Sequence, residues 1–147
     1  MQRLARNTGL VVTMALVFWA SDARAELFSK AYSFKPDTTL QVGADMQGGL
    51  RLDSVEFVVP KSDAQAGTFS GPKVKVSISN LGTAAAKIGI AIAITDDDGR
   101  LVAVASGGTK LFPLRADRQI VYTLSIENVN AELSKGTVFR ISVEPTP

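Results

Sequence analysis

The sequence has no cysteine and no histidine in 147 residues. Their absence removes thiolate and imidazole ligands for a metal ion, and it removes every nucleophile that depends on a Ser-His or Cys-His pair. The commonest general base is missing as well. Because no disulfide can form, the hydrophobic core alone must stabilise the folded chain.

Aromatic residues are also few, with one Trp, two Tyr and seven Phe. The single tryptophan, Trp19, stands within the N-terminal 25 residues. Surfaces that bind sugars usually present exposed aromatic rings to the ligand. The sequence therefore supplies little for carbohydrate binding.

Residues 1–25 have the three-part pattern of a secretory signal peptide. Met1 to Asn7 carry two arginines and no acid, Gly9 to Ala20 are almost all apolar, and Ala23-Arg24-Ala25 provide small residues for cleavage. A membrane anchor is the competing interpretation, but a helix of that apolar run would reach only about 18 Å across a hydrocarbon layer of roughly 30 Å. We expect cleavage before Glu26, export to the periplasm or the medium, and no membrane span afterwards.

The charge of the chain depends on this leader. Its removal takes away Arg3, Arg6, Arg24 and Asp22, so totals of 16 basic and 14 acidic residues become thirteen of each sign. The sequence pI of about 9.0 thus comes largely from the leader. Without a basic stripe, the remaining chain lacks the electrostatic pattern of a nucleic-acid-binding protein.

The rest of the chain alternates apolar and polar residues with the period of two that is typical of half-buried strands. The clearest runs place Val74, Val76 and Ile78 on one face, and Ile88, Ile90, Ile92 and Ile94 on another; the same pattern turns Ile120, Tyr122, Leu124 and Ile126 toward the core. Seven strands are predicted: Leu50 to Val59, Lys73 to Asn80, Lys87 to Thr95, Arg100 to Ala105, Thr109 to Leu114, Arg118 to Ile126 and Thr137 to Glu144.

Short strands without alternating helices predict an all-β fold. We expect an immunoglobulin-like antiparallel β-sandwich over residues 50–147, preceded by an N-terminal extension or covering strand at residues 26–49. The inward positions change parity within Leu50 to Val59, which predicts a β-bulge at Asp53-Ser54.

A resemblance supports this fold. Val76-Ser77-Ile78-Ser79-Asn80-Leu81-Gly82-Thr83-Ala84, followed by Ile94-Thr95-Asp96-Asp97-Asp98-Gly99-Arg100-Leu101-Val102, resembles the strand, N-x-G, strand and D-x-D-G pattern of exported domains of the CARDB and FxLYD kind. The likeness extends from about Leu50 to Glu144. It implies a binding or spacing module and transfers no catalytic residue.

The acidic run Asp96-Asp97-Asp98, followed by Gly99, is the most conspicuous local motif. In a calcium loop these residues would fill the middle positions, but the first and twelfth positions, Ile94 and Ala105, offer no side-chain oxygen. A hairpin turn at Asp98-Gly99 fits better and predicts positive φ at both residues.

A weaker calcium site that uses Asp96, Asp97 and Asp98 remains the alternative to a plain turn. Catalysis would have to rely on carboxylate pairs such as Asp53 and Glu56, which usually are solvated when no pocket shifts their pKa. We expect no enzyme activity and no cofactor.

The strongest sign of a binding surface is the second face of the third strand, which carries only Gly89, Ala91, Ala93 and Thr95. A solvated sheet usually shows long polar side chains there, so something is expected to cover it. Residues 26–44 are the simpler candidate, and a partner protein or a second copy of the chain is the other. Phe69 and Phe112, in polar or Pro-containing loops, either reach a partner or tuck into the sandwich, and tucking is the simpler expectation.

Together these patterns predict an exported, non-catalytic β-sandwich that acts by contact with another protein or as a homo-oligomer. A ligand-binding module, for carbohydrate or calcium, is the alternative. No interaction with nucleic acid is expected.

Overall fold

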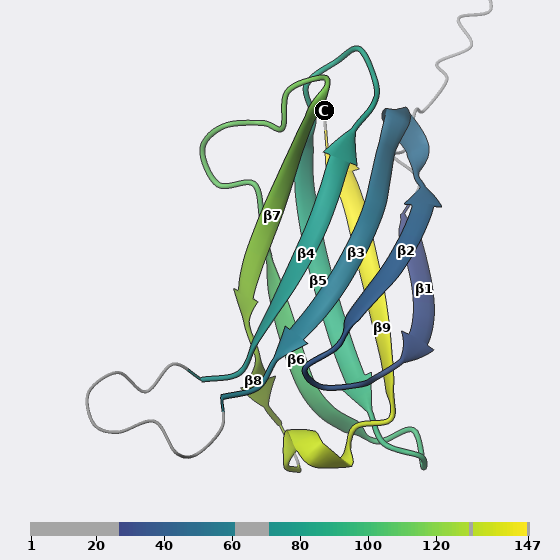
Figure 1. Ribbon diagram of the computed structural model, residues 1–147, viewed down its shortest axis with the longest axis vertical. Helices are drawn as coiled ribbons and strands as arrows, with labels where there is room; N and C mark the ends of the chain where they lie inside the picture. Colours follow the sequence, from purple (N-terminus) through teal and green to yellow (C-terminus); the bar gives the residue numbers. More distant parts are fainter. Residues whose placement is uncertain (1–26, 61–70, 130, 147) are drawn as a thin grey trace, which may run out of the picture.

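The computed structural model describes residues 27–60, 71–129 and 131–146, which fold into two antiparallel sheets packed face to face (Figure 1). The predicted β-sandwich is confirmed. Residues 1–25, which the sequence predicts to be a signal peptide, and Phe69 lie outside the described residues. Among the described residues, no helix is long and apolar enough to cross a membrane.

One sheet has five strands and the other has four. The five-stranded sheet is, in order, β1 (Phe28–Ser33), β9 (Val138–Thr146), β5 (Lys87–Thr95), β6 (Leu101–Gly108) and β8 (Glu127–Asn128). The four-stranded sheet is β2 (Thr39–Asp45), β3 (Leu50–Val58), β4 (Lys73–Asn80) and β7 (Arg118–Ser125). Two short 3-10 turns complete the described structure, η1 (Gln47–Gly49) and η2 (Leu133–Lys135).

From β3 onward, the chain visits the two sheets in the order of an immunoglobulin-like sandwich. β3, β4 and β7 are neighbours in one sheet, as strands A, B and E are in that fold, and β5 and β9 are neighbours in the other, as strands C and F are. β1 occupies the position beside β9 that the last strand, G, normally fills. The sandwich therefore begins at Phe28 and not at Leu50, because the N-terminal extension supplies one edge strand to each sheet.

The predicted alternation accounts for the core. Val74, Val76 and Ile78 are fully buried, and the four isoleucines of β5 are at most 3% exposed. The predicted bulge is confirmed too, since the pairing of β3 with β4 shifts register between Leu52 and Ser54. The extra residue lets the side chains on both sides of the shift face the same core.

Two predictions are wrong, namely that residues 109–114 form a strand and that Ile120 is buried. Residues 109–114 form a loop whose only ladder contact is the bridge between Ala86 and Leu114, since Pro113 has no N–H and the Thr109 hydroxyl accepts from the Ile88 N–H instead. Ile120 is 40% exposed. It pairs with Ile78, but β7 is the outermost strand of its sheet, so one flank of Ile120 stays open to solvent.

Candidate functional site: the open side of the sandwich

The two sheets are not closed along one side of the molecule. β1 and β2 are the edge strands of different sheets and lie on the same side (Figure 1), and within the described chain each pairs with one neighbour, β9 and β3 respectively. An edge strand presents a row of backbone N–H and C=O groups without a ladder partner. This side of the sandwich thus offers two free strand edges.

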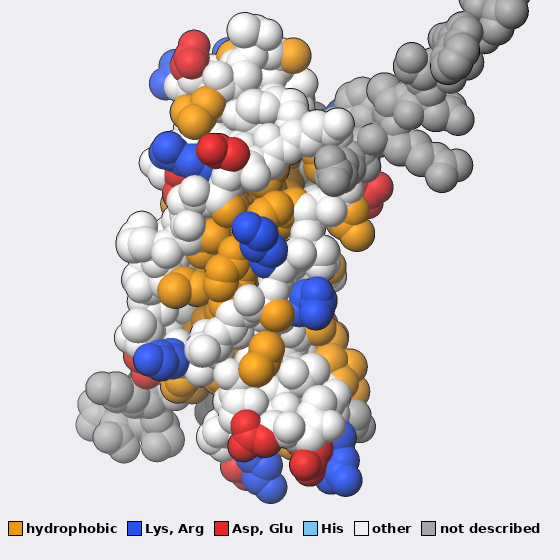
Figure 2. Space-filling model, turned by 90° about the vertical axis from the view of Figure 1, so that its right-hand side faces the viewer, with side chains coloured by type: hydrophobic (Ala, Val, Ile, Leu, Met, Phe, Trp, Pro, Cys, Tyr) orange, Lys and Arg blue, Asp and Glu red, His pale blue; other side chains and the backbone are white. Residues whose placement is uncertain are grey.

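An apolar cleft of about 420 Å³ lies between these edges. Its apolar lining is formed by the buried core residues Val55, Phe57 and Phe139 and by the half-buried Tyr32 and Leu40. Figure 2, which faces this side, shows hydrophobic side chains gathered in a band with basic side chains beside them. The remaining lining is polar: Ser33, Lys35, Thr38 and Thr39.

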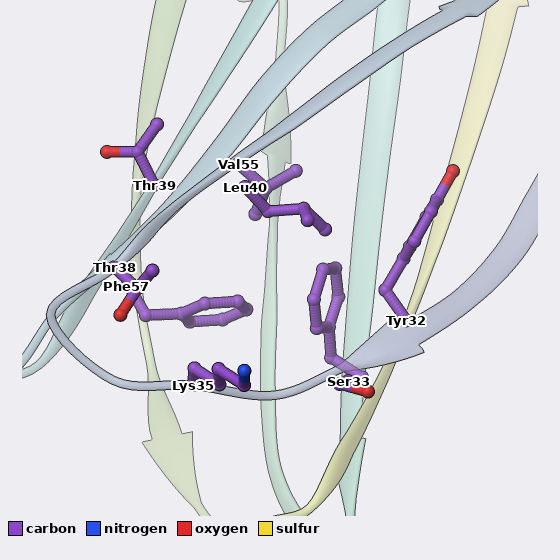
Figure 3. Close-up of a pocket in the computed structure, with 9 residues that line it drawn as sticks. Tyr32, Ser33, Lys35, Thr38, Thr39, Leu40, Val55 and Phe57 are labelled. Atoms are coloured by element: carbon purple, nitrogen blue, oxygen red, sulfur yellow. The ribbon is translucent and has the colours of Figure 1, made fainter.

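The arrangement of the cleft follows from the strands that carry it. In Figure 3, the rings of Tyr32 and Phe57 stand on opposite flanks, Leu40 points between them, and Lys35 lies below on the β1–β2 connection. Tyr32 and Leu40 point inward because they occupy the inward positions of their strands, opposite Phe139 and Val55 in the two ladders. The β-period therefore aims apolar groups from both sheets into one space.

A chain of aromatic contacts connects the wall of the cleft with the core. The ring centroids of Tyr32 and Phe139 are 5.5 Å apart, those of Phe139 and Phe57 are 4.9 Å apart, and those of Phe57 and Phe34 are 4.7 Å apart. The last two pairs meet edge to face, the arrangement that ring quadrupoles favour. Burial raises the pKa of Tyr32, so its hydroxyl stays protonated at neutral pH and can donate a hydrogen bond.

The connection between β1 and β2 is fastened to β3. Asp37 adopts a left-handed φ of 52°; its N–H donates to the Phe57 carbonyl at 2.8 Å, and its Oδ1 accepts from the Val59 N–H at 3.0 Å. These two bonds hold the residues on either side of Asp37 at the mouth of the cleft. Lys35 is consequently presented from a fixed segment of backbone.

Basic side chains stand beside the cleft, together with the acid Asp37 of the β1–β2 connection. Lys35 lines it, and Lys30 of β1 lies 5.6 Å above the ring of Phe28. Neither lysine belongs to an ion pair in the described part of the chain, where the pairs are Arg51 with Asp53, Lys75 with Glu56, and Arg100 with Asp98. A bound molecule with a negative group would therefore not have to displace an ion-pair partner from either lysine.

The face predicted from the sequence lies elsewhere, on the outside of the five-stranded sheet. Gly89 and Ala91 are exposed there, and Ala93 and Thr95 are half-buried. The expectation that residues 26–44 cover this face is corrected: they supply β1 and β2, whose backbone groups pair along the sheet edges. Edge pairing satisfies hydrogen-bonding groups that face packing would leave open.

The strand register extends this smooth face beyond β5. One row across four strands consists of Ser29, Ser142, Ala91 and Ser106, in which the Ser142 hydroxyl donates to Ser29 at 3.1 Å. The row beside it contains Arg140 between Ala31 and Ala93. Small side chains thus cover much of the outer surface, which the sequence of one strand alone could not reveal.

The acidic run forms a turn, with one correction. Only Gly99 has positive φ, at 75°, whereas both Asp98 and Gly99 were expected to. The backbone carbonyl of Asp96 accepts a hydrogen bond from the Gly99 N–H at 3.0 Å. The side-chain Oδ1 of Asp96 accepts from the N–H groups of Asp98 and Arg100 at 3.0 and 2.8 Å. This is a turn followed by a left-handed bulge residue, which needs a single positive φ.

The turn uses its carboxylates unequally. Asp96 is occupied by backbone donors, while Asp97 and Asp98 are exposed. Within residues 27–60, 71–129 and 131–146 no group of three or more acidic side chains is close enough to hold a metal ion. Of the three carboxylates, that of Asp96 thus serves the hairpin.

Asp53, considered above for a carboxylate pair, belongs to a polar network on the outside of the four-stranded sheet. It accepts hydrogen bonds from Ser79 at 2.6 Å, Arg51 at 2.8 Å and Gln119 at 3.0 Å. Burial raises the pKa of Asp53, but these hydrogen bonds and the Arg51 charge together hold it below its usual value. Glu56 has a separate partner, Lys75 at 3.2 Å. Sequence reasoning missed the network because its members come from three strands.

Phe112 does not tuck into the sandwich. It is 83% exposed, next to Leu111 at 82%.

No family model matches the sequence, and no curated protein or solved structure is significantly similar to it. The arguments for function therefore come from the geometry of the chain itself.

Proposed function

We propose that this protein is an exported, non-catalytic interaction module that binds a partner protein by strand addition at its open side. The observation that carries the proposal is the apolar cleft flanked by the two edge strands β1 and β2. A peptide strand that pairs with an edge gains backbone hydrogen bonds, and its alternate side chains enter the adjoining pocket. Backbone pairing supplies affinity, and the pocket supplies specificity.

β1 is the better edge for such pairing. Its register with β9 is regular along its whole length, whereas β2 has a register shift between Gln41 and Ala44 and a left-handed Gly43. A bulge twists an edge away from an incoming strand. The partner strand therefore adds to β1 and extends the five-stranded sheet.

The lysines favour a different protein over a second copy of this chain. Two copies that paired through β1 would bring Lys30 and its equivalent to one edge, and like charges on an edge strand oppose pairing. A partner strand with an acidic residue would instead meet Lys30 or Lys35. The inferred partner thus has alternating apolar residues with at least one carboxylate.

Export and the lack of catalysis rest on the sequence. Residues 1–25 have the signal-peptide pattern, and the chain has no cysteine or histidine. The carboxylates weighed for catalysis, Asp53 and Glu56, are each engaged by neighbouring side chains. A ligand-binding role for carbohydrate or calcium has less support, since Phe112 is the only described aromatic residue that is fully exposed and Asp96 is occupied by its own turn.

Site-specific photo-crosslinking in the native host tests the proposal. A photoreactive residue at Ser33, exposed on β1 beside the cleft, should capture one defined protein, while the same residue at Thr123, exposed on β7 at the opposite edge, should not. The added change Leu40→Glu, which places a charge in the cleft, should abolish the Ser33 adduct. Equal adducts at both edges, or an adduct unaffected by Leu40→Glu, would count against strand addition.

A further inference from the structure

The loop between β6 and β7, residues 109–117, exposes an apolar tip. Leu111 and Phe112 are the two most exposed large hydrophobic residues of the described chain, at 82% and 83%, and Pro113 beside them is exposed as well. Figure 1 shows the loop projecting sideways from the sandwich next to β7. Exposed apolar groups that cluster on a surface are candidates for contact sites.

Both ends of the loop are fastened to the sandwich. The Thr109 N–H donates to the Ile88 carbonyl at 2.8 Å, and its hydroxyl lies 3.1 Å from that of Tyr122. At the other end Leu114 is buried, and its carbonyl accepts from the Asn80 side chain at 2.9 Å. Leu111 and Phe112 therefore stand on a loop whose two ends are anchored to the sandwich.

The surroundings of the tip are basic. Lys110, Arg115 and Arg118 are exposed and belong to no ion pair of the described residues, and Asp117 is the single acid between Arg100 and Arg118. Beside the loop, Lys110 shares a shallow hollow with Lys87 and Glu144, whose charges offset each other. The tip thus combines exposed apolar groups with a net positive collar.

We propose that this loop binds a bilayer surface that contains anionic lipids. Leu111 and Phe112 enter the interfacial layer, and Lys110, Arg115 and Arg118 contact the acidic head groups. Apolar burial and attraction to anionic lipid add in such contacts, and basic side chains keep their charge at head-group level while their stems cover apolar surface. The chain lies on the membrane and does not span it.

The sheet order makes this contact compatible with the proposed partner site. β6 and β7 lie toward the edges opposite β1 and β2 (Figure 1), so the cleft faces away from the membrane when the loop is inserted. The module could then hold a partner while it rests on the bilayer. The membrane contact does not depend on the partner, and either proposal can fail alone.

Vesicle sedimentation tests the membrane contact. The exported protein, purified from its host, should partition onto vesicles of phosphatidylglycerol and phosphatidylcholine, and much less onto phosphatidylcholine alone. Lys110→Gln with Arg115→Gln should lower the partition coefficient about 10- to 30-fold, since each basic residue contributes about a factor of five. High salt should have a similar effect.

Leu111→Ser with Phe112→Ser should lower partition at least tenfold on the mixed vesicles. The matched control is Val129→Ser with Val138→Ser, two hydrophobic residues that are 48% and 39% exposed, and it should bind as the unchanged protein does. No binding at millimolar lipid, equal binding to both vesicle types, or equal loss in the control would overturn the proposal. A protein target for the tip would then replace the bilayer.

Discussion

Tyr32 lies against Phe139 with 5.5 Å between their ring centroids, and this contact joins the edge strand β1 to the aromatic chain that crosses the core. The same Tyr32 side chain forms a flank of the cleft. Its ring therefore contributes both to the stability of the sandwich and to the shape of the proposed binding site.

Removing this ring should cost stability, and removing only its hydroxyl should not. We expect Tyr32→Ala to lower the free energy of unfolding by about 1 to 3 kcal/mol, because the side chain is half-buried against Phe139. Tyr32→Phe should stay within about 0.5 kcal/mol of the unchanged protein. Urea denaturation measures both, and an equal loss in the two variants would contradict this account of the contact.

Ile92 tests the register of the core. It is 2% exposed in the middle of β5, so Ile92→Ala should destabilise by about 2 to 5 kcal/mol through lost burial and the cavity left behind. Val121→Ala, at a position 54% exposed on β7, should cost less than about 1 kcal/mol. Thermal and urea unfolding measure the stability of both variants. A loss at Ile92 as small as that at Val121 would indicate that Ile92 is exposed to solvent.

Asn80 organises the loops at one end of the sandwich. Fully buried, it donates to the carbonyls of Ala84 and Leu114 and accepts from the Gly82 N–H. Asn80→Ala removes its side-chain bonds to all three groups, and of these only the Leu114 carbonyl keeps a second partner, the Ala86 N–H. We expect a loss of about 2 to 4 kcal/mol. The exposed Asn128→Ala is the control. Similar unfolding midpoints for the two variants would refute this role.

Asp53 should make the free energy of unfolding depend on pH in the acidic range. Since its pKa is lowered in the folded chain, its contribution is present above the unfolded pKa, about 3.9, and is lost as pH falls through the lower folded value. Asp53→Asn should therefore destabilise at pH 7 and have progressively less effect below about pH 4. Unfolding followed from pH 3 to pH 7 tests the sign. Glu56→Gln, which breaks a more exposed pair, is the control and should cost less than about 1 kcal/mol at pH 7.

Asp96 and Asp97 should behave differently although they are neighbours. Asp96→Ala removes the acceptor of two backbone N–H groups and should cost about 1 to 2 kcal/mol, whereas the exposed Asp97→Ala should cost less than about 0.5 kcal/mol. The melting temperature should be the same in calcium and in chelator. A calcium-dependent rise that Asp97→Ala removes would favour the metal alternative.

Much of the fold could be predicted because strand alternation is local. The isoleucines of β5 needed only their own spacing to be placed in the core, and the parity change around Asp53 was enough to locate a bulge. The predicted strand from Thr109 to Leu114 was wrong because the Ile88 N–H bonds to the Thr109 hydroxyl and not to a strand carbonyl. This bond joins residues 21 positions apart, which local patterns do not reveal.

The candidate site was beyond local reasoning. In the sequence, the apolar lining residues of the cleft look like ordinary inward residues of their strands: Tyr32, Leu40, Val55, Phe57 and Phe139. Only the pairing of β1 with β9 and of β2 with β3 brings them to one cleft. The network around Asp53 was missed for the same reason.

By itself, the sequence determined the class of fold, the faces of most strands and the absence of cysteine- and histidine-based chemistry, because side-chain period and residue type are properties of short segments. Tertiary structure alone decided which edges remain open, that Phe112 is held in solvent, and that the N-terminal segment extends both sheets and does not cover one. Those outcomes depend on which distant backbone groups pair with each other, and no short stretch of residues specifies its partner.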